Sequence, residues 1–313
     1  MTWRDSTLGT TIRYGLEFLG LGDRVAPFPV RRLAGPWQAE EISVPPGWTP
    51  AAPDFVGVGT QKSGTSWWAG LINQHPSVVP TRWERKEMHY FTHFLETPLT
   101  PEAITTYWRA FARPAGRICG EWTPNYLASP YTLPLISRAA PDARILVMLR
   151  DPVRRFESGY NHELKQRFGP IFGPRLRMSV VKRYALRKES IWMGMYGAQL
   201  DILLRHFPRE RILVLQYERC RAEPAAMIRK TYAFLGLDQS FQPSGFAEEV
   251  NTQRRVTPPL SEEARDLLAQ VYAADVQHVK ALFPDDIDLS LWSSFSSTGR
   301  AALPVHRPEP VRV

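Results

Sequence analysis

The chain has 313 residues, and its 39 Lys and Arg against 31 Asp and Glu give a formal net charge of +8. Hydrophobic residues make up 43% and charged residues 22%, which excludes a disordered or fibrous protein and leaves room for one large domain or two smaller ones. With no apolar run of about 18 residues, no secretory-signal layout and only two cysteines, the sequence predicts a cytoplasmic protein without a disulfide framework or zinc cluster.

The first 53 residues differ in composition from the rest of the chain. A short amphipathic stretch with Ile12, Leu16 and Leu19 leads into Pro-rich sequence, which disfavours regular structure. We therefore expect an N-terminal extension over residues 1–53, a single domain over 54–295 and a C-terminal tail over 296–313.

Apolar runs typical of buried strands alternate with segments of helical spacing. Strands are expected at residues 55–58, 117–121, 143–149 and 211–215. Helices are expected at residues 65–73, from 151 onward, and at 194–207, 224–236 and 261–282. This alternation predicts an α/β fold: a P-loop-like, three-layer domain with a central parallel sheet flanked by helices.

The first predicted strand runs into a turn rich in Gly, Ser and Thr and then into a helix. The spacing from Gly59 to Gly64 is that of a nucleotide-triphosphate P-loop, which presents backbone N–H groups and a helix N-terminus to an anion. A P-loop lysine follows the second glycine, but here Thr65 holds that position and Lys62 lies inside the turn. We expect Lys62 to face the first phosphate and the group that leaves it.

A second candidate anion site follows the strand at 143–149. Arg150 ends this strand, at the edge where ligands of open α/β sheets collect, and Asp151 and Pro152 begin a helix. Ser158 lies about two turns into that helix, on a face that can look back at Arg150. A guanidinium and a hydroxyl suit a separate phosphate, although this helix start alone also fits a plain cap with a salt bridge.

Two phosphate sites on one sheet, one of them with an internal lysine, resemble the PAPS-dependent sulfotransferases. The resemblance covers residues 54–292, and it implies PAPS as donor, PAP as product and no required metal. Residues 62–67 match the 5′-phosphosulfate loop of that family, and within the family the chain looks most similar to the branch of heparan-sulfate sulfotransferases and their bacterial relatives. The nucleotide-binding residues that the resemblance implies are Lys62, Ser63, Gly64, Thr65, Ser66, Arg150 and Ser158, with Arg254 and Arg255 where relatives close over the nucleotide.

Residues 86–91 and 121–126 are similar to the substrate-cleft motifs of the same branch. The resemblance implies that Glu87 is the general base and that His89 orients the acceptor or the glutamate. We expect Glu121, at the end of the predicted strand 117–121, to be a second acceptor contact or an alternative base. Relatives carry Lys after this glutamate, whereas Trp122 suits stacking on an uncharged sugar or ring. Glu87 could instead simply pair with a neighbouring cation, Lys86 or Arg85.

The positive charge is concentrated in residues 165–188, which contain eight basic residues and no acidic one. Such a segment is either a solvated basic face or a site for an anionic acceptor or the inner membrane surface. Nucleic acid is not expected, because no nucleic-acid-binding motif accompanies the segment.

The sequence supports three hypotheses. The first is a sulfotransferase that moves a sulfuryl group from PAPS, by in-line displacement, to a hydroxyl, or less readily an amine, of a glycan, glycolipid or small natural product. The second is a P-loop kinase or other ATP-dependent phosphotransferase, which the position of Lys62 disfavours. The third is a basic membrane-surface or polyanion-binding protein, which is compatible with the first.

Overall fold

A computed structural model describes residues 42–83, 87–168, 181, 184–185, 190–246 and 259–296. Several sequence predictions therefore lie outside the described residues. They are the amphipathic stretch near the N-terminus, the C-terminal tail, Arg254 and Arg255, and most of the basic segment 165–188.

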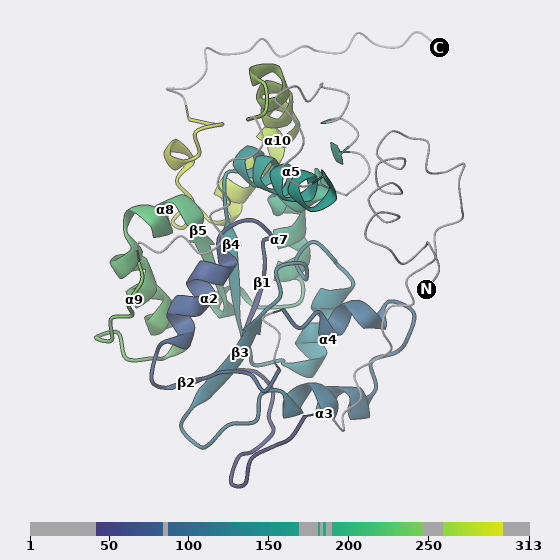
Figure 1. The fold of residues 1–313 in the computed structure, drawn as a ribbon, viewed down its shortest axis with the longest axis vertical. Coiled ribbons are helices and arrows are strands. Elements are labelled where there is room, and N and C mark those ends of the chain that lie inside the picture. Colours follow the sequence, from purple (N-terminus) through teal and green to yellow (C-terminus); the bar gives the residue numbers. More distant parts are fainter. Residues whose placement is uncertain are drawn as a thin grey trace.

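Five parallel strands form the central sheet (Figure 1). Their spatial order is β2-β3-β1-β4-β5. In chain order they are β1 (Phe55–Gly59), β2 (Val78–Val79), β3 (Ile118–Trp122), β4 (Arg144–Leu149) and β5 (Ile212–Gln216). Strands β1, β4 and β5 are almost wholly buried, as expected for apolar runs covered on both faces. The predicted parallel sheet is confirmed, and β1 lies at its centre.

One face of the sheet is covered by α2 (Thr65–Asn73) and α9 (Pro224–Leu235), with α8 (Tyr217–Ala222) beside them (Figure 1). Alternate strand residues point to this face, including Leu146 and Met148 of β4. They pack with the apolar sides of α2 and α9 in one of two buried clusters. The helix α2 has the predicted bounds.

The opposite face is covered by a larger set of helices. Val56, Ile145 and Val147 point to it and join the second buried cluster. The helices that pack there are α3 (Pro101–Arg109), α4 (Thr132–Ala139), α5 (Pro152–Phe168), α7 (Tyr196–Leu204) and α10 (Glu262–Leu282). Helix, sheet and helix thus form the three predicted layers, and α3 and α4 add two helices that the sequence analysis did not predict.

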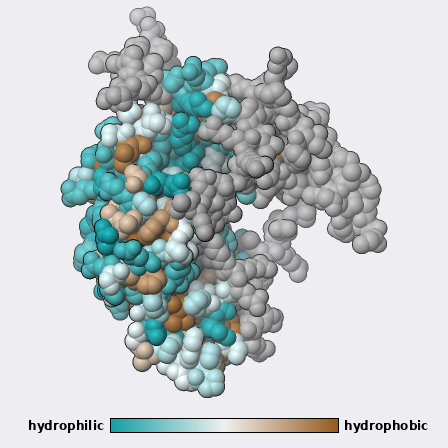
Figure 2. Space-filling view, turned by 60° about the vertical axis from the view of Figure 1, so that its left-hand side comes forward, coloured by the Kyte–Doolittle hydropathy of each residue, from teal (hydrophilic) through white to brown (hydrophobic). Residues whose placement is uncertain are grey.

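Part of the predicted N-terminal extension packs on this domain. Ile42 is buried in the larger cluster, and Thr49 pairs with Arg113 through two backbone hydrogen bonds of 3.0 and 3.2 Å. On the face shown in Figure 2, hydrophilic side chains cover most of the described surface and apolar ones form small separate groups. Among the described residues, no helix is both long and apolar enough to cross a membrane.

Candidate active site

The turn between β1 and α2 is tied to the neighbouring strand β4. The Thr60 backbone N–H and hydroxyl both donate to the Met148 carbonyl, over 3.0 and 2.9 Å. The hydroxyl of Ser63, which is fully buried, lies 2.6 Å from that of Thr60. The turn is therefore held at the carboxyl edge of the sheet, where α/β proteins bind ligands. Thr60 was not among the predicted site residues, although its place after β1 is a signal that could have found it.

Two residues of this turn have a left-handed backbone, Lys62 with φ of 69° and Gly64 with φ of 86°. Such alternation directs successive N–H groups into one concavity, a common anion site. Thr65 and Ser66 begin α2, whose first turn carries no acidic residue and no side-chain cap. The positive end of the helix therefore adds to the positive charge of Lys62.

Arg150 lies at the same site, directly after β4. Its Nη1 donates to the main-chain carbonyl of Lys62 over 3.1 Å, and its guanidinium lies 4.9 Å from the centre of the Tyr217 ring. The same ring lies against Gly64, where an added Cβ would come within 2.6 Å of it. The structure thus places Arg150 against the turn that carries Lys62. Tyr217 was missed, although it directly follows β5 at the same sheet edge.

The helix α5 supplies the third side of this site. Ser158 is partly buried on α5, and the next residue, Gly159, lies beside the lysine side chain. A Cβ built on Gly159 would lie 4.0 Å from Lys62 Cγ. The structure therefore brings together Lys62, Arg150 and the turn of α5 that contains Ser158.

The start of α5 is fixed by Asp151, as the sequence predicts. One carboxylate oxygen accepts the N–H groups of Val153 and Arg154, and the other accepts the Ser294 N–H over 2.9 Å. Asp151 in turn donates its own N–H to Glu218, whose second oxygen accepts the Trp292 indole N–H, both over 3.0 Å.

We call Asp151, Glu218, Trp292 and Ser294 the C-terminal latch. Burial, and secondarily the nearby Asp151 charge, raises the pKa of Glu218 to about 7, although its hydrogen bond from the Asp151 N–H and the Arg150 charge act in the opposite direction. The latch holds the turn that carries Arg150.

Glu87 and His89 form the candidate acceptor side. Glu87 Oε2 lies 3.2 Å from His89 Nε2, and the two side chains are 31% and 38% exposed. Their neighbours Met88, Tyr90 and Phe91 are buried in the larger core cluster. These three residues anchor the segment and leave the Glu87–His89 pair partly open to solvent.

The Glu121 side chain is buried in the core, and the residue is only 3% exposed. This burial corrects the predicted role of Glu121 as an acceptor contact. The hydroxyls of Thr123, Tyr107 and Tyr126 donate to its carboxylate over 2.6, 2.7 and 3.4 Å. Burial raises the pKa of Glu121 to about 7, while the three hydroxyl donors and the His89 charge lower it. Sequence reasoning missed Thr123, the residue that links this carboxylate to the segment with Glu87.

Trp122 is 2% exposed and lies on the other face of the sheet, so it is not an acceptor platform. Its ring covers Gly57, where an added Cβ would come within 2.2 Å, and its indole N–H donates to the Gly59 carbonyl over 3.1 Å. The physical reason is strand alternation, because neighbours such as Glu121 and Trp122 point to opposite faces.

The donor and acceptor halves of the site lie at the ends of two adjacent strands, β1 and β3. Beyond β3, the Thr123 N–H donates to Gly57 and the Leu127 N–H to Val58, over 2.9 and 2.8 Å. The Thr123 hydroxyl oxygen accepts the Met88 N–H over 3.0 Å. The segment with Glu87 is thus attached to the end of β3, beside the Lys62 turn at the end of β1.

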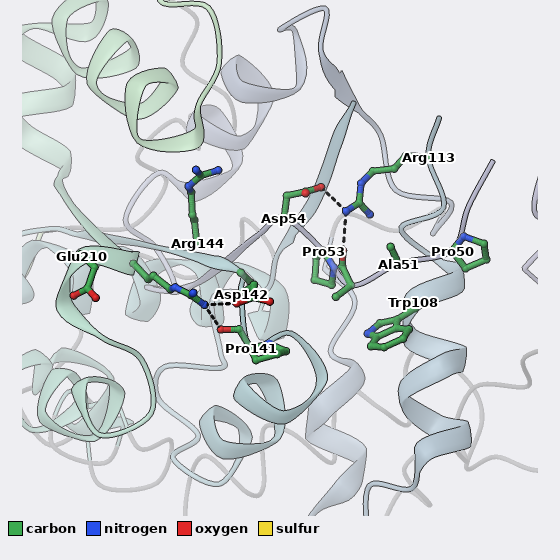
Figure 3. A pocket seen from close by; sticks show the side chains of 13 residues that line it. Pro50, Ala51, Pro53, Asp54, Trp108, Arg113, Pro141, Asp142, Arg144 and Glu210 are labelled. Atoms are coloured by element: carbon green, nitrogen blue, oxygen red, sulfur yellow. Dashed lines mark hydrogen bonds and ion pairs between the residues drawn. The ribbon is translucent and has the colours of Figure 1, made fainter. Parts of the chain in front are cut away.

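A cavity of about 780 Å³ opens at the other end of the sheet, beside the amino ends of β1, β4 and β5 (Figure 3). Four of its charged side chains are paired within the wall, Asp54 with Arg113 and Asp142 with Arg211, each over 2.9 Å. None of the predicted site residues lines it. Within the described part of the chain, no three His, Cys, Asp or Glu side chains could together hold a metal ion.

A family model described as a sulfotransferase domain matches residues 52–257, about two thirds of the chain. This protein belongs to the sulfotransferase family. The resemblance seen in the sequence is therefore confirmed, as is the predicted family of enzyme, and the P-loop kinase hypothesis is disfavoured.

The curated relatives of this chain belong to the same branch of the family. It is 29% identical over 192 residues to the heparan sulfate glucosamine 3-O-sulfotransferase 3B1 of Mus musculus, covering 59% of this chain and 46% of that protein. It is 25% identical over 261 residues to the bifunctional heparan sulfate N-deacetylase/N-sulfotransferase 3 of Homo sapiens, covering 70% of this chain and 28% of that protein. The chain thus spans less than half the length of these curated relatives.

A solved structure resembles this chain over most of its length. The crystal structure of a sulfotransferase from Alicyclobacillus acidocaldarius superposes with a TM-score of 0.60 at 29% sequence identity. The match covers 77% of this chain and 99% of that one. The predicted α/β fold therefore agrees with that of a known member of the family.

Proposed function

We propose that this protein transfers a sulfuryl group from PAPS to an acceptor hydroxyl and releases PAP. The observation that carries the proposal is the hydrogen bond from Arg150 Nη1 to the main-chain carbonyl of Lys62, which holds Arg150, at the end of β4, against the lysine-bearing turn that follows the adjacent strand β1. A donor with two separate phosphate-bearing ends fits such a pair, whereas a P-loop triphosphate site aligns its lysine and phosphates in one loop.

The residues present suit PAPS. The turn from Ser63 to Ser66, with its left-handed backbone at Gly64 and the helix N-terminus behind it, would hold the 5′-phosphosulfate. Arg150 and Ser158 would hold the 3′-phosphate through charge-assisted hydrogen bonds. Arg254 and Arg255 lie outside the described residues, so their part in closing over the nucleotide rests on the sequence resemblance alone.

PAPS supplies an activated sulfuryl group, and the chain supplies the base and the charges. Glu87 would take the proton of the acceptor hydroxyl as its oxygen attacks sulfur, with His89 Nε2 holding the carboxylate at 3.2 Å. The new bond joins the acceptor oxygen to sulfur as the bond from sulfur to the phosphate oxygen breaks. The Lys62 ammonium group would neutralise the charge left on that phosphate.

The acceptor is proposed to be a hydroxyl of a glycan, glycolipid or small natural product. The relatives named for heparan sulfate support a glycan, and an amine acceptor is the less favoured choice. The eight basic residues of the segment 165–188 favour an acceptor that is anionic or lies at a membrane surface. Peripheral contact with the inner membrane surface from a cytoplasmic location stays a sequence-based hypothesis.

The direct test measures PAP binding by calorimetry at low salt and PAP release from labelled PAPS with a panel of glycan acceptors. Lys62→Ala is compared with Lys230→Ala, a lysine on α9 that pairs with Asp286 over 2.7 Å. We expect transfer to fall by about 100-fold or more in Lys62→Ala only. Undetectable PAP affinity of the unmodified protein at low salt would overturn the proposal.

A further inference from the structure

We propose that Glu121 is a positioning residue that acts through Thr123 to hold the segment bearing Glu87 and His89. This inference rests on the proposed function, because it takes Glu87 as the base. In this role the Glu121 carboxylate, at the end of β3, contacts neither the acceptor nor the donor.

The carboxylate of Glu121 collects hydroxyl groups from separate parts of the chain. Tyr107 comes from α3, whereas Thr123 and Tyr126 come from the turn after β3. All three hydroxyl-bearing side chains are fully buried, and all three donate to Glu121. A buried polar network whose members are all satisfied fixes its parts in one arrangement.

Thr123 transmits this order to the acceptor segment. A hydroxyl has one proton and two lone pairs, and the proton of Thr123 is committed to Glu121 Oε2 over 2.6 Å. Its lone pairs therefore face the backbone N–H groups of Met88 and His89, which donate to it over 3.0 and 3.4 Å. The orientation of the Thr123 hydroxyl therefore determines whether the backbone N–H groups of Met88 and His89 have a hydrogen-bond acceptor.

Aromatic packing also links the hydrogen-bond network around Glu121 to the segment that carries Glu87 and His89. The Phe91 ring lies between the two tyrosines, with ring centres 4.7 Å from Tyr107 and 5.6 Å from Tyr126. The backbone of His89 is left-handed, with φ of 52°, a conformation that a non-glycine residue keeps only where its surroundings impose it. The core under the segment therefore determines where the Glu87–His89 pair lies.

The alternative role of Glu121 as the base does not fit its surroundings. The side chain is only 3% exposed and both of its oxygens already accept buried hydroxyls, whereas Glu87 is 31% exposed. A base must come within hydrogen-bond reach of the proton that it removes. Glu87 is open to an acceptor from solvent without rearrangement of the core, whereas Glu121 is not.

Glu121→Gln is an informative change because it keeps shape and alters only hydrogen-bond polarity. A glutamine offers one acceptor oxygen and one donor NH₂ group, so it cannot accept on both sides. If the amide oxygen faces Tyr107, the NH₂ group faces Thr123 and occupies the lone pair that the Met88 N–H uses. If the amide is reversed, the Tyr107 hydroxyl loses its acceptor.

The experiment combines kinetics with amide exchange on Glu121→Gln, Thr123→Val, Thr123→Ser and the Glu121→Gln/Thr123→Val double variant. In both Glu121→Gln and Thr123→Val we expect kcat to fall by about 10- to 100-fold, the cost of a small misplacement of the base, with PAP affinity within about 2-fold of the unmodified protein. Hydrogen exchange at the Met88 and His89 amides should accelerate. Thr123→Ser, which keeps the hydroxyl, should restore kcat and protection.

The double variant separates positioning from direct chemistry. If Glu121 acts through Thr123, adding Glu121→Gln to Thr123→Val lowers kcat by less than about 2-fold, because interacting residues are not additive. A full further loss in the double variant, or a Thr123→Val protein with normal kcat and normal protection of Met88, would overturn the inference.

Failure of the proposed function gives a different result. If the unmodified protein binds no PAP and transfers no sulfuryl group, the proposed function fails, yet the exchange data still decide whether Glu121 and Thr123 hold the segment. If Glu121→Gln does not fold, the comparison of Thr123→Val with Thr123→Ser decides the same point.

Discussion

Arg150 donates a hydrogen bond from Nη1 to the main-chain carbonyl of Lys62 over 3.1 Å. The acceptor is a backbone oxygen, so the bond leaves the positive charge of Arg150 uncompensated by it. The same guanidinium lies over the Tyr217 ring. One arginine thus orders the lysine-bearing turn and stays available to an anion, which makes it the most informative residue to change.

Arg150→Ala should weaken PAP binding by about 10- to 100-fold, the cost of losing a charge-assisted hydrogen bond to a phosphate. Arg154→Ala is the matched control, because Arg154 lies in the first turn of α5 but its guanidinium pairs with the Glu157 carboxylate over 3.3 Å. Calorimetric titration with PAP measures both. Equal affinity in the two variants would show that Arg150 does not contact the nucleotide.

Gly64→Ala should destabilise the protein by about 2–4 kcal/mol, since the left-handed backbone at φ of 86° is unfavourable for alanine and the new methyl group would meet the Tyr217 ring. Gly70→Ala on the same helix has open space around its Cβ position and should stabilise by about 0.5–1 kcal/mol. Urea unfolding of the two variants gives the comparison. A Gly64→Ala protein as stable as Gly70→Ala would contradict this geometry.

Glu87→Gln should reduce kcat by about 100- to 10,000-fold while PAP affinity is kept, because a general base acts on the acceptor proton and does not bind the nucleotide. Glu96→Gln, an exposed carboxylate further along the same segment, serves as control and should leave kcat unchanged. Initial rates with labelled PAPS separate the two. Retention of full activity in Glu87→Gln would remove Glu87 from the role of base.

The stability difference between the unmodified protein and Glu121→Gln should depend on pH. Burial raises the pKa of Glu121 from 4.5 to about 7, so between these values the folded state binds more protons than the unfolded state. Rising pH therefore removes stability that is fully present below pH 4.5, by up to about 1.4 kcal/mol per pH unit until pH 7 is passed.

Urea unfolding at pH 5, 6, 7 and 8 measures this dependence. Taking the difference between the two proteins cancels the contribution of Glu218, whose pKa is raised to a similar value. A difference that stays constant over this range would mean that Glu121 titrates as an ordinary glutamate.

The sheet and the donor side of the site follow from local sequence. Apolar runs predicted four strands, and the strand–turn–helix around Lys62 forms where its Gly, Ser and Thr residues indicate. Arg150 could be placed because the carboxyl ends of parallel strands meet at one edge. For the same reason Glu121 and Trp122 should have been assigned to opposite faces, since the two-residue period of a strand was visible in the sequence.

Both the acceptor side and the support of Arg150 depend on contacts that no local sequence pattern predicts. Tyr107 lies 14 positions before Glu121 on a helix that the sequence did not indicate, and Glu218 lies 67 positions after Asp151. Spacing gives no sign of such pairs, because the fold alone brings them together. The burial of Glu121 could not be predicted either. Carboxylates are rarely buried unless they are paired, and the sequence does not show which hydroxyl groups pair with this one.

The C-terminal latch has a consequence for the order in which this molecule matures. The Asp151 carboxylate accepts a hydrogen bond from the N–H of Ser294. Ser294 lies 143 residues further along the chain and is therefore synthesised later. A nascent chain can therefore complete β1, β4 and the lysine turn, yet leave the Arg150 turn unfastened until translation of the described domain is nearly finished. Donor affinity in this protein should be among the last properties to emerge from the ribosome, and the first to disappear when the chain is shortened before Trp292.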